Sequence, residues 1–485
     1  MAGEELFHLP VTELARRIEA KTLSPVDLTQ LYLSRSEKFG PRLNAYARLT
    51  PEIALAQAAA AEKEIRRGHY RGPLHGIPYA AKDLLAVKGV PVTWGAKPYA
   101  DQVFDFDATV IEHLNRAGAV MIGKASMIEL AGGMNYRFAS ASLQGEAKNP
   151  WNTNCWTCGS SSGSGAIVAA GLAAFAIGTE TWGSIICPSA FCGVSGMRPT
   201  YGRVSRYGLI AFASSLDRVG PLTKNVKDAA TVLQVIAGKD IVDATSSDRP
   251  VEDYVGELAR PVEGLRIGVP EEYFGEGLDP EIRDAIHDVL DGLKAAGCVV
   301  KPVSLPHTRY AIPTYYVIAT AEASSNLSRF DGVRFGFRAE ANTLSSMYRK
   351  TRDLGFGAEV KRRILLGTYA LSAGYYDAYY RKAQQVRTLL ARDFLAAFAE
   401  VDVLVAPVTP TPAFRLGEKT DDPVKMYLED IYSVAASLAG ICGASVPCGT
   451  TKEGLPIGVQ VLGKHFDEGT MLRVAHAVEK GQKKE

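Results

Sequence analysis

The sequence predicts an α/β fold in one domain that spans residues 1–485. Segments with helix-start signals alternate with short apolar runs of strand length, which is the pattern of an α/β protein. The alternation returns in the second half of the chain, and no repeat, low-complexity array or polar linker divides the two halves. With 47% hydrophobic residues, a chain of 485 residues can bury one large core.

Helix starts near the N-terminus are marked by a hydroxyl residue followed by proline. Ser24-Pro25 and Thr50-Pro51 each place a capping hydroxyl before a proline at the first helical position, with an acidic residue in the first turn. The second of these helices, rich in alanine, is expected to end at Gly68. Another helix is expected between Asp107 and Gly118.

Apolar runs of strand length lie between these helices. Residues 76–82 are expected to form a strand that ends in Lys82, and residues 119–123 a second strand. The longest apolar run, residues 166–177, is about 12 residues long, whereas a membrane helix needs about 20. We therefore expect this run to form a buried core helix.

The second half of the chain shows the same alternation. The expected strands cover residues 265–269, 401–406 and 457–462, and the expected helices cover about 280–296, 376–399 and 424–439. Residues 306–375, rich in aromatic residues and arginine, are expected to form a helical cap over a cleft.

Charge and cysteine content limit the classes of partner. With 54 basic and 53 acidic residues the formal charge is +1, which supports neither direct nucleic-acid binding nor an anionic membrane partner. The N-terminus has acidic residues where a secretory signal needs basic ones, so we expect a cytoplasmic protein. The seven cysteines are expected to be reduced thiols. Cys155-x-x-Cys158 lacks the strand-to-helix context of a redox motif, and Cys187 and Cys192 have four residues between them, which argues against a zinc site of four thiolates. No metal and no cofactor is therefore expected.

A serine-rich stretch, Cys158-Gly-Ser-Ser-Ser-Gly-Ser-Gly165, runs directly into the longest apolar run. This context predicts the N-terminus of a buried helix, where unpaired backbone N–H groups favour hydroxyls and developing negative charge. Two interpretations remain open: a serine cap with glycines for close packing, or hydroxyls presented to a substrate.

A second Gly/Ser element, Gly178-Thr-Glu-Thr-Trp-Gly-Ser-Ile-Ile-Cys-Pro188, follows shortly. Together with Lys82 it supplies the parts of a serine hydrolase that uses no histidine, because a desolvated lysine can accept the proton of a serine nucleophile. None of the eight histidines forms an H-x-x-x-H pair. Taken alone, a lysine at a strand end is more often a surface residue, so this alternative for Lys82 stays open.

The strand lysine and the two Gly/Ser elements, in this order and spacing, resemble the amidase signature family. The resemblance implies a large mixed β-sheet covered by helices on both faces, with a signature core at about residues 72–220. It also implies that Lys82 is the general base, Ser160 the bridging serine on a cis peptide, and Ser184 the nucleophile.

Three longer segments, residues 201–217, 359–368 and 421–427, are similar to one branch of that family, the A subunits of glutamyl-tRNA(Gln) amidotransferases. This resemblance implies that Arg363 and Asp430 hold a glutamine substrate, and Tyr315 is a further candidate for substrate contact.

The catalytic loops depart from that branch. Where the A subunits have Asp-Thr-Gly-Gly-Ser-Ile-Arg, this chain has Glu180-Thr-Trp-Gly-Ser-Ile-Ile186, and the form Gly-Thr-Glu-Thr is similar to free-standing amidases. Trp182 is expected either to line the acyl pocket or to pack away from it. Because Ile186 removes a guanidinium, we expect Glu180 to lack that partner.

These departures favour a free-standing serine hydrolase of small molecules that cleaves the C–N acyl bond of an amide, an aryl amide or a carbamate. Its oxyanion would be held by the backbone N–H groups of Thr181, Trp182, Gly183 and Ser184. The first alternative is the glutaminase subunit of a glutamyl-tRNA(Gln) amidotransferase, which requires partner subunits. The second is a non-catalytic member of the family.

Overall fold

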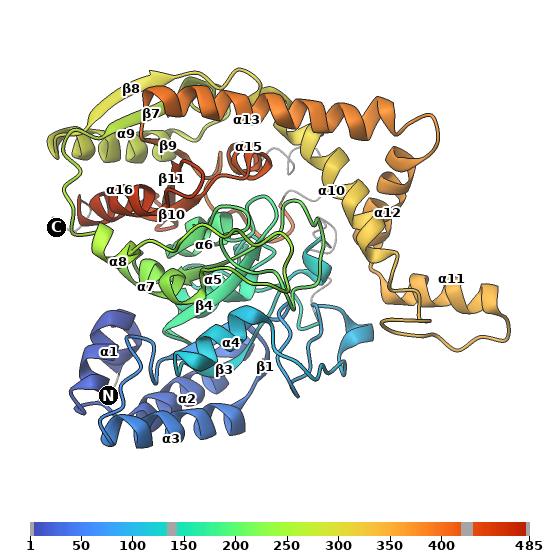
Figure 1. Cartoon of the computed structure of the whole chain (residues 1–485), viewed down its shortest axis with the longest axis horizontal. Helices are drawn as coiled ribbons and strands as arrows, with labels where there is room; N and C mark the ends of the chain where they lie inside the picture. The colour runs from blue at the N-terminus through green and yellow to red at the C-terminus, as the bar shows by residue number, and fades with distance from the viewer. Residues whose placement is uncertain (1–3, 133–142, 419–429, 482–485) are drawn as a thin grey trace.

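The protein is built around one eleven-stranded β-sheet (Figure 1). The computed structural model describes residues 4–132, 143–418 and 430–481. The strand order is β1-β3-β2-β4-β6-β5-β10-β11-β9-β7-β8. The strands are β1 Tyr46–Leu49, β2 Pro78–Lys82, β3 Val120–Ala125, β4 Phe175–Glu180, β5 Ser195–Arg198, β6 Arg218–Thr223, β7 Arg266–Pro270, β8 Val299–Val303, β9 Val403–Pro407, β10 Gly443–Thr450 and β11 Pro456–Gly463.

The sheet is mixed, as the family resemblance implies. Strand β2 is parallel to β3 and to β4, and β7 is parallel to β8 and β9, whereas the other neighbours are antiparallel. Because β2 and β4 are parallel neighbours, their carboxyl ends lie at the same edge of the sheet. This arrangement places Lys82 beside the segment that follows Glu180.

Helices cover both faces of the sheet (Figure 1), and the expected α/β class is confirmed. The helices are α1 Val11–Glu19, α2 Pro25–Leu43, α3 Pro51–Arg66, α4 Thr109–Arg116, α5 Ser162–Ala169, α6 Ile186–Cys192, α7 Val226–Ile236, α8 Tyr254–Glu257, α9 Pro280–Ala295, α10 Ala311–Leu327, α11 Leu344–Gly355, α12 Ala358–Leu371, α13 Lys382–Glu400, α15 Ile431–Ala439 and α16 Glu468–Gly481.

The two hydroxyl–proline helix starts behave differently. The Ser24 hydroxyl accepts hydrogen bonds from the backbone N–H groups of Val26 (3.1 Å) and Asp27 (3.2 Å), so it caps α2 as expected. Thr50 makes no such bond at the start of α3, because its hydroxyl donates to the carbonyl of Met121 in the neighbouring strand (3.0 Å).

The expected core helix over residues 166–177 is wrong beyond Ala169. Helix α5 ends at Ala169, and strand β4 begins at Phe175. Gly171 lies between them with φ of 62°, a left-handed conformation that glycine adopts without steric cost. A Cβ at this position would also lie 2.9 Å from the carbonyl oxygen of Phe7. Gly171 is also the one residue that interrupts the apolar run in the sequence, and the chain turns there.

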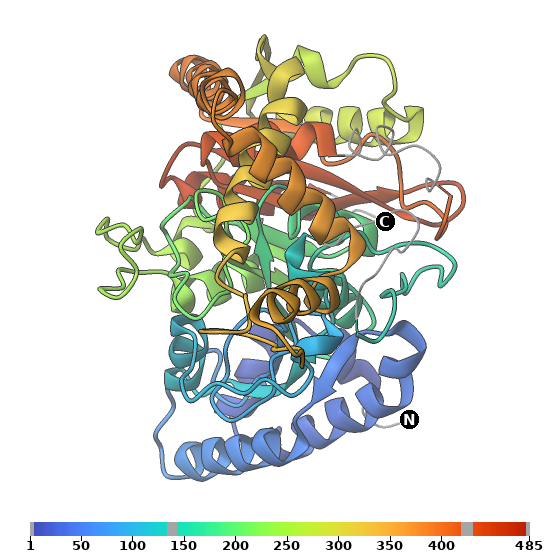
Figure 2. The ribbon, with the colours of Figure 1, turned by 90° about the vertical axis from the view of Figure 1, so that its right-hand side faces the viewer.

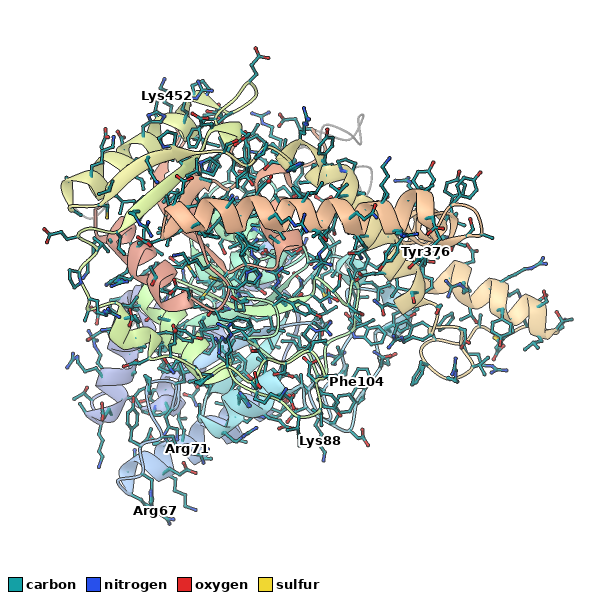
Figure 3. The ribbon with its side chains drawn as sticks, turned by 45° about the horizontal axis from the view of Figure 1, so that its top comes forward. Arg67, Arg71, Lys88, Phe104, Tyr376 and Lys452 are labelled. Atoms are coloured by element: carbon teal, nitrogen blue, oxygen red, sulfur yellow. The ribbon has the colours of Figure 1, made fainter. Side chains whose placement is uncertain are left out.

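The segment expected to form a cap is helical, with α10, α11 and α12 on one side of the molecule (Figure 1). Figure 3 shows the exposed Tyr376 near the outer end of α13, far from Arg67 at the end of α3. The cap over a cleft, the core boundaries at 72–220 and the single domain stay predictions. Of the helix expected at 424–439, the structure shows α15, while residues 424–429 and the segment 421–427 lie outside the described residues.

Figures 1 and 2 agree in placing α2 and α3 at one end of the molecule and α9 and α13 at the other. The strand order explains this arrangement, because the first half of the chain supplies one side of the sheet and the second half supplies the other. Among the described residues, no helix has both the length and the apolar character needed to cross a membrane.

Candidate active site

Lys82 is the last residue of β2, and its side chain is fully buried. Its Nζ lies 2.7 Å from Ser160 Oγ, 3.0 Å from Ser161 Oγ and 2.8 Å from Thr179 Oγ1. The Thr179 carbonyl oxygen lies 3.3 Å away. The alternative of a surface lysine is therefore wrong, because β3 and β4 enclose β2 on both sides.

Burial lowers the pKa of Lys82 well below the usual value for lysine, since the charged ammonium loses its water. The negative charges of Asp217 and Glu180 oppose this shift in the pKa but do not cancel it. Hydroxyl and carbonyl oxygens are the only hydrogen-bonding partners of Lys82 among the described residues, and none carries a formal charge. Lys82 can therefore exist as a neutral amine.

The serine-rich stretch forms the start of α5, as its sequence context predicts. The peptide bond between Gly159 and Ser160 is cis, in agreement with the family resemblance. Ser161 ties this turn to β4, because its hydroxyl donates to the Thr179 carbonyl (3.0 Å) and accepts from the Thr179 N–H (3.2 Å). Both the packing role and the presentation of hydroxyls thus occur in the same stretch.

Ser184 lies in the turn between β4 and α6 and is fully buried. The backbone N–H of Ser161 donates to its carbonyl oxygen (3.3 Å), which joins the two Gly/Ser elements. Among the described residues, Ser184 Oγ has no hydrogen-bond partner. The contact between Lys82 and Ser160 is therefore formed in this structure, whereas a hydrogen bond from Ser184 to Ser160 is not.

The backbone around Ser184 divides into two groups of N–H donors. The N–H groups of residues 181–184 have no acceptor among the described residues. Those of Ile185 (2.8 Å) and Ile186 (3.0 Å) donate to the carboxylate of Glu180. This glutamate also pairs with Arg198 (2.8 Å). Glu180 thus lacks a guanidinium from position 186, as expected, but Arg198 of β5 supplies another.

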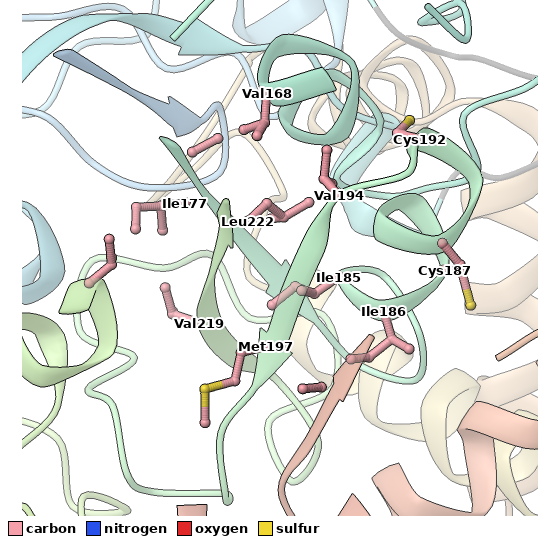
Figure 4. Close-up of a cluster of buried hydrophobic side chains, with 14 of the residues drawn as sticks. Val168, Ile177, Ile185, Ile186, Cys187, Cys192, Val194, Met197, Val219 and Leu222 are labelled. Atoms are coloured by element: carbon pink, nitrogen blue, oxygen red, sulfur yellow. The ribbon is translucent and has the colours of Figure 1, made fainter. Parts of the chain in front are cut away.

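Ile185 and Ile186 point into a buried hydrophobic cluster that includes Met197 and Val219 (Figure 4). An apolar side chain suits position 186 in these surroundings, since a guanidinium there would be buried among apolar groups.

Trp182 is buried and contacts two of the residues expected to bind substrate. Its ring lies 5.2 Å from the ring of Tyr315 on α10, and the guanidinium of Arg363 on α12 lies 5.8 Å from its centroid. Arg363 also lies over the rings of Phe212 (5.9 Å) and Tyr316 (5.6 Å). The structure thus brings Trp182, Tyr315 and Arg363 together.

Arg363 is the inward-facing member of an arginine pair. It is buried and its Nε donates to Glu359 (3.0 Å), whereas half of the Arg362 side chain is exposed. Burial raises the pKa of Tyr315 well above its ordinary value. The positive charge of Arg363 lowers this pKa, and the negative charge of Asp430, which is also buried, raises it. Asp430 therefore lies near the same cluster.

The family model described as Amidase matches residues 27–472 of this sequence. The chain belongs to the amidase family. Enzymes of this family act on C–N bonds, and the expectation taken from the Gly/Ser elements is confirmed at this level.

Relatives within the amidase family are similar over nearly the whole chain. A protein of Acidobacterium capsulatum, named as the A subunit of glutamyl-tRNA(Gln) amidotransferase, is 61% identical over 91% of this chain and 92% of its own. The protein of the same name from Geobacter metallireducens is 52% identical over 98% and 97%.

Two crystal structures of amidase-family proteins are also similar. The A subunit of glutamyl-tRNA(Gln) amidotransferase from Thermotoga maritima is 36% identical with a TM-score of 0.80, over 98% of this chain and 95% of its own. Peptide amidase from Stenotrophomonas maltophilia is 34% identical with a TM-score of 0.82, over 98% and 96%.

These relatives overturn the main functional expectation. The catalytic loops favoured a free-standing hydrolase of amides, aryl amides or carbamates, and this expectation is wrong because relatives at 50–61% identity carry the name of the amidotransferase subunit. The departures at Trp182 and Ile186 misled because they are local, whereas the similarity extends over the whole chain.

Four residues that contact the site were not found from the sequence: Ser161, Thr179, Arg198 and Ser437, whose hydroxyl donates to the Trp182 carbonyl (3.0 Å). Ser161 and Thr179 lie inside the two recognised elements, so their hydroxyls were available signals. Arg198 and Ser437 lie in β5 and α15 and have no local motif.

The seven cysteines, all within the described residues, are free thiols. Burial raises the pKa of Cys192 above its ordinary value, and contact with Cys158 together with burial raises that of Cys187. Among the described residues, no three His, Cys, Asp or Glu side chains are grouped so that they could hold a metal ion.

Proposed function

We propose that this chain is the glutamine-hydrolysing A subunit of a glutamyl-tRNA(Gln) amidotransferase. The observation that carries the proposal is the 61% identity to a relative of that name over more than nine-tenths of both chains. The contacts of Lys82, Ser160, Trp182 and Arg363 support it, because they bring the expected catalytic and substrate-binding side chains to one buried place.

Ser184 is the proposed nucleophile. Its hydroxyl attacks the side-chain amide carbonyl of glutamine, and its proton passes through Ser160 to the neutral amine of Lys82. The 2.7 Å contact between Lys82 and Ser160 provides the second half of this relay. The first half requires a hydrogen bond from the Ser184 hydroxyl to Ser160.

The oxyanion of the tetrahedral intermediate is proposed to be held by backbone N–H groups of Thr181, Trp182, Gly183 and Ser184. Their lack of acceptors among the described residues supports this role, because unpaired buried donors favour a ligand that accepts from them. Gly183 is needed in the turn, since a Cβ there would lie 2.7 Å from both Cys187 Sγ and Ser433 Oγ.

Trp182, Tyr315, Arg363 and Asp430 are proposed to form the glutamine pocket. Arg363 suits the α-carboxylate and Asp430 the α-ammonium of a free amino acid, since each pairs opposite charges. The ring of Trp182 would lie against the aliphatic part of the substrate and would limit its length.

As the intermediate collapses, its C–N bond breaks and the departing nitrogen takes the proton held by Lys82, so that it leaves as ammonia; water then hydrolyses the acyl-enzyme to glutamate. Ammonia is the group that an amidotransferase passes to its acceptor, so the proposal includes partner subunits that bind the glutamyl-tRNA. The cytoplasmic location expected from the sequence stays a prediction.

The experiment measures glutamate release from glutamine by the purified chain, alone and with the other amidotransferase subunits of Acidobacterium capsulatum. We expect glutaminase activity that Ser184→Ala lowers by about 10⁴–10⁶-fold and that Lys82→Ala lowers almost as far. Ser162→Ala is the matched control, because Ser162 lies in the same turn but does not contact Lys82. Absence of glutamine hydrolysis with and without the partners would contradict the proposal, as would full activity in Ser184→Ala.

A further inference from the structure

The carboxylate of Glu180 holds the backbone on the C-terminal side of the proposed nucleophile. Glu180 is the last residue of β4. Its side chain extends past the turn and accepts hydrogen bonds from the backbone N–H groups of Ile185 (2.8 Å) and Ile186 (3.0 Å). These two donors begin α6 and would otherwise be unpaired at a buried helix start. One side chain therefore fixes where the residues after Ser184 lie.

Arg198 and Ser437 hold the N-terminal side of the same turn. Arg198, the last residue of β5, donates from Nη1 to Glu180 (2.8 Å) and to Ser437 Oγ (3.4 Å). Ser437, on α15, donates to the carbonyl oxygen of Trp182 (3.0 Å). All three side chains are fully buried or nearly so. A continuous chain of hydrogen bonds thus runs from Trp182 to Ile186 around Ser184.

The hydrogen bonds of Glu180, Arg198 and Ser437 leave a defined set of backbone N–H donors free. Carbonyl contacts and the Glu180 carboxylate anchor the turn at residues 182, 185 and 186, while the N–H groups of residues 181–184 keep no acceptor among the described residues. Backbone donors can stabilise an oxyanion only if they are held in place before the reaction.

A buried ion pair is a costly way to stabilise a fold. Replacing both partners with apolar residues of similar size is often neutral or stabilising, whereas removing one partner leaves an unpaired buried charge. The Glu180–Arg198 pair, with both side chains fully buried, is therefore better explained by the geometry that it imposes than by stability.

We propose that Glu180, Arg198 and Ser437 are positioning residues that set the backbone path of residues 181–186 for oxyanion binding. None of them touches the reacting atoms; each acts through the backbone of the turn. The inference rests on the proposed function in that Ser184 must be the nucleophile.

The test compares the double variant Glu180→Met/Arg198→Met with wild type, because the double change leaves no unpaired charge. One readout is kcat and KM for glutamine. The other is the rate at which an alkyl fluorophosphonate labels Ser184, a step in which an Oγ–P bond forms, the P–F bond breaks, fluoride leaves and the serine proton passes through Ser160 to Lys82. We expect kcat and the labelling rate to fall by about 10²-fold, with KM within about twofold.

The matched control is Arg203→Met/Glu468→Met. That pair is also buried (3.6 Å), and its carboxylate also accepts a backbone N–H, from Thr200 (2.9 Å), but it does not hold the Ser184 turn. We expect its labelling rate to stay within about twofold of wild type. An equal loss in both double variants, or no loss in Glu180→Met/Arg198→Met, would overturn the positioning role.

Ser437→Ala keeps the test decisive if the double variant does not fold. Loss of a single hydroxyl frees the Trp182 carbonyl, so we expect labelling to slow by about tenfold, and an unchanged rate would overturn the inference. Failure of the proposed function gives a different result: wild type would then show no labelling that depends on Ser184, or labelling without glutamine hydrolysis.

Discussion

Lys82 illustrates how burial alone can change the chemistry of one residue. Its pKa is lowered mainly because the ammonium loses its water, and the neutral amine is the form that accepts a proton. Activity should therefore be present above this lowered pKa and lost as pH falls through it.

The pH dependence can be tested with the conservative variant Lys82→Arg. We expect kcat/KM of wild type for glutamine to rise with pH and level off below the ordinary pKa of lysine. Lys82→Arg should stay inactive throughout, because arginine keeps its proton. A pH–rate profile checks both, and activity of Lys82→Arg at high pH would rule out Lys82 as the base.

Trp182 is among the largest fully buried side chains, packed on Tyr315 and Arg363. Trp182→Ala should lower the free energy of unfolding by about 3–5 kcal/mol, because it leaves a cavity in a closed site. Trp151→Ala is the matched control: Trp151 is 54% exposed, so its loss should cost about 1 kcal/mol or less. Denaturant midpoints compare the two, and equal shifts would mean that the site collapses around the smaller side chain.

For single residues, the sequence predicts the members of a local motif and misses contacts made by residues far along the chain. Lys82, Ser160 and Ser184 were identifiable because hydroxyls, glycines and a strand-end lysine occur together in local patterns. The partner of Glu180 was not, because Arg198 reaches it from another strand and Ser437 contacts Trp182 across 255 residues. Nothing near either residue marks the contact.

Helices α10 and α12, which carry Tyr315 and Arg363, pack closely at Gly367. A Cβ at Gly367 would overlap the Thr320 carbonyl on α10, so Gly367→Ala should destabilise the protein by about 1–3 kcal/mol. Gly292→Ala, on the exposed side of α9 with open space around it, should instead stabilise by up to about 1 kcal/mol. Denaturant unfolding should therefore show the free energy of unfolding fall in Gly367→Ala and rise in Gly292→Ala, and a change of the same sign in both would contradict this packing.

Glu129 joins the segment after β3 to α12, because its carboxylate accepts a hydrogen bond from the backbone N–H of Gly357 (2.7 Å) at the start of that helix. Burial raises its pKa to about 7, while the Gly357 N–H and Lys361 lower it. The folded state thus binds the proton more tightly than the unfolded state does, and the free energy of unfolding should fall as pH rises from about 4.5 to about 7.

Glu129→Gln should remove this part of the pH dependence, because glutamine does not titrate. Relative to the variant, wild type should lose about 2.5 kcal/mol of stability between pH 5 and 8. Denaturant unfolding at several pH values measures the difference. Parallel profiles for wild type and Glu129→Gln would show that the carboxyl titrates normally in the fold.

Elements with strong local signals were predicted well, and those that depend on neighbours were not. Strands β2, β7, β9 and β11 and helices α2, α3, α4 and α9 match apolar runs and start signals. Strand β5 is four residues long and contains Gly196, and β10 contains Pro447 at a register shift, so neither shows a clear strand pattern. Gly171 interrupts the apolar run, but apolar residues continue on both sides of it, so the run was expected to form a single helix.

The order of strands joins distant parts of the chain into one sheet. Strands β10 and β11, from the C-terminal part, lie between β5 and β9, so the sheet is continuous only when they are present. A chain that ends at residue 440 should therefore fail to unfold cooperatively in a thermal melt. A sharp transition together with Ser184 labelling in that chain would show that the first half folds independently.

Sequence alone predicts that strands exist but not this order, because β10 pairs with β5 across more than half of the chain. The mixed character of the sheet was implied only by the resemblance to a family. Whole-chain similarity favours the branch of the amidotransferase A subunits, whereas the altered positions in the catalytic loops favoured another.

The contact between Ser437 and Trp182 bears on how the enzyme is made in the cell. A ribosome adds about 5–20 residues per second, and these partners are 255 residues apart. The proposed nucleophile thus leaves the ribosome roughly 10–50 seconds before the helix that supports its turn. During that interval the emerging chain carries the proposed nucleophile without the hydrogen bond from Ser437 to the Trp182 carbonyl, so we expect the proposed activity to appear only when translation is nearly complete.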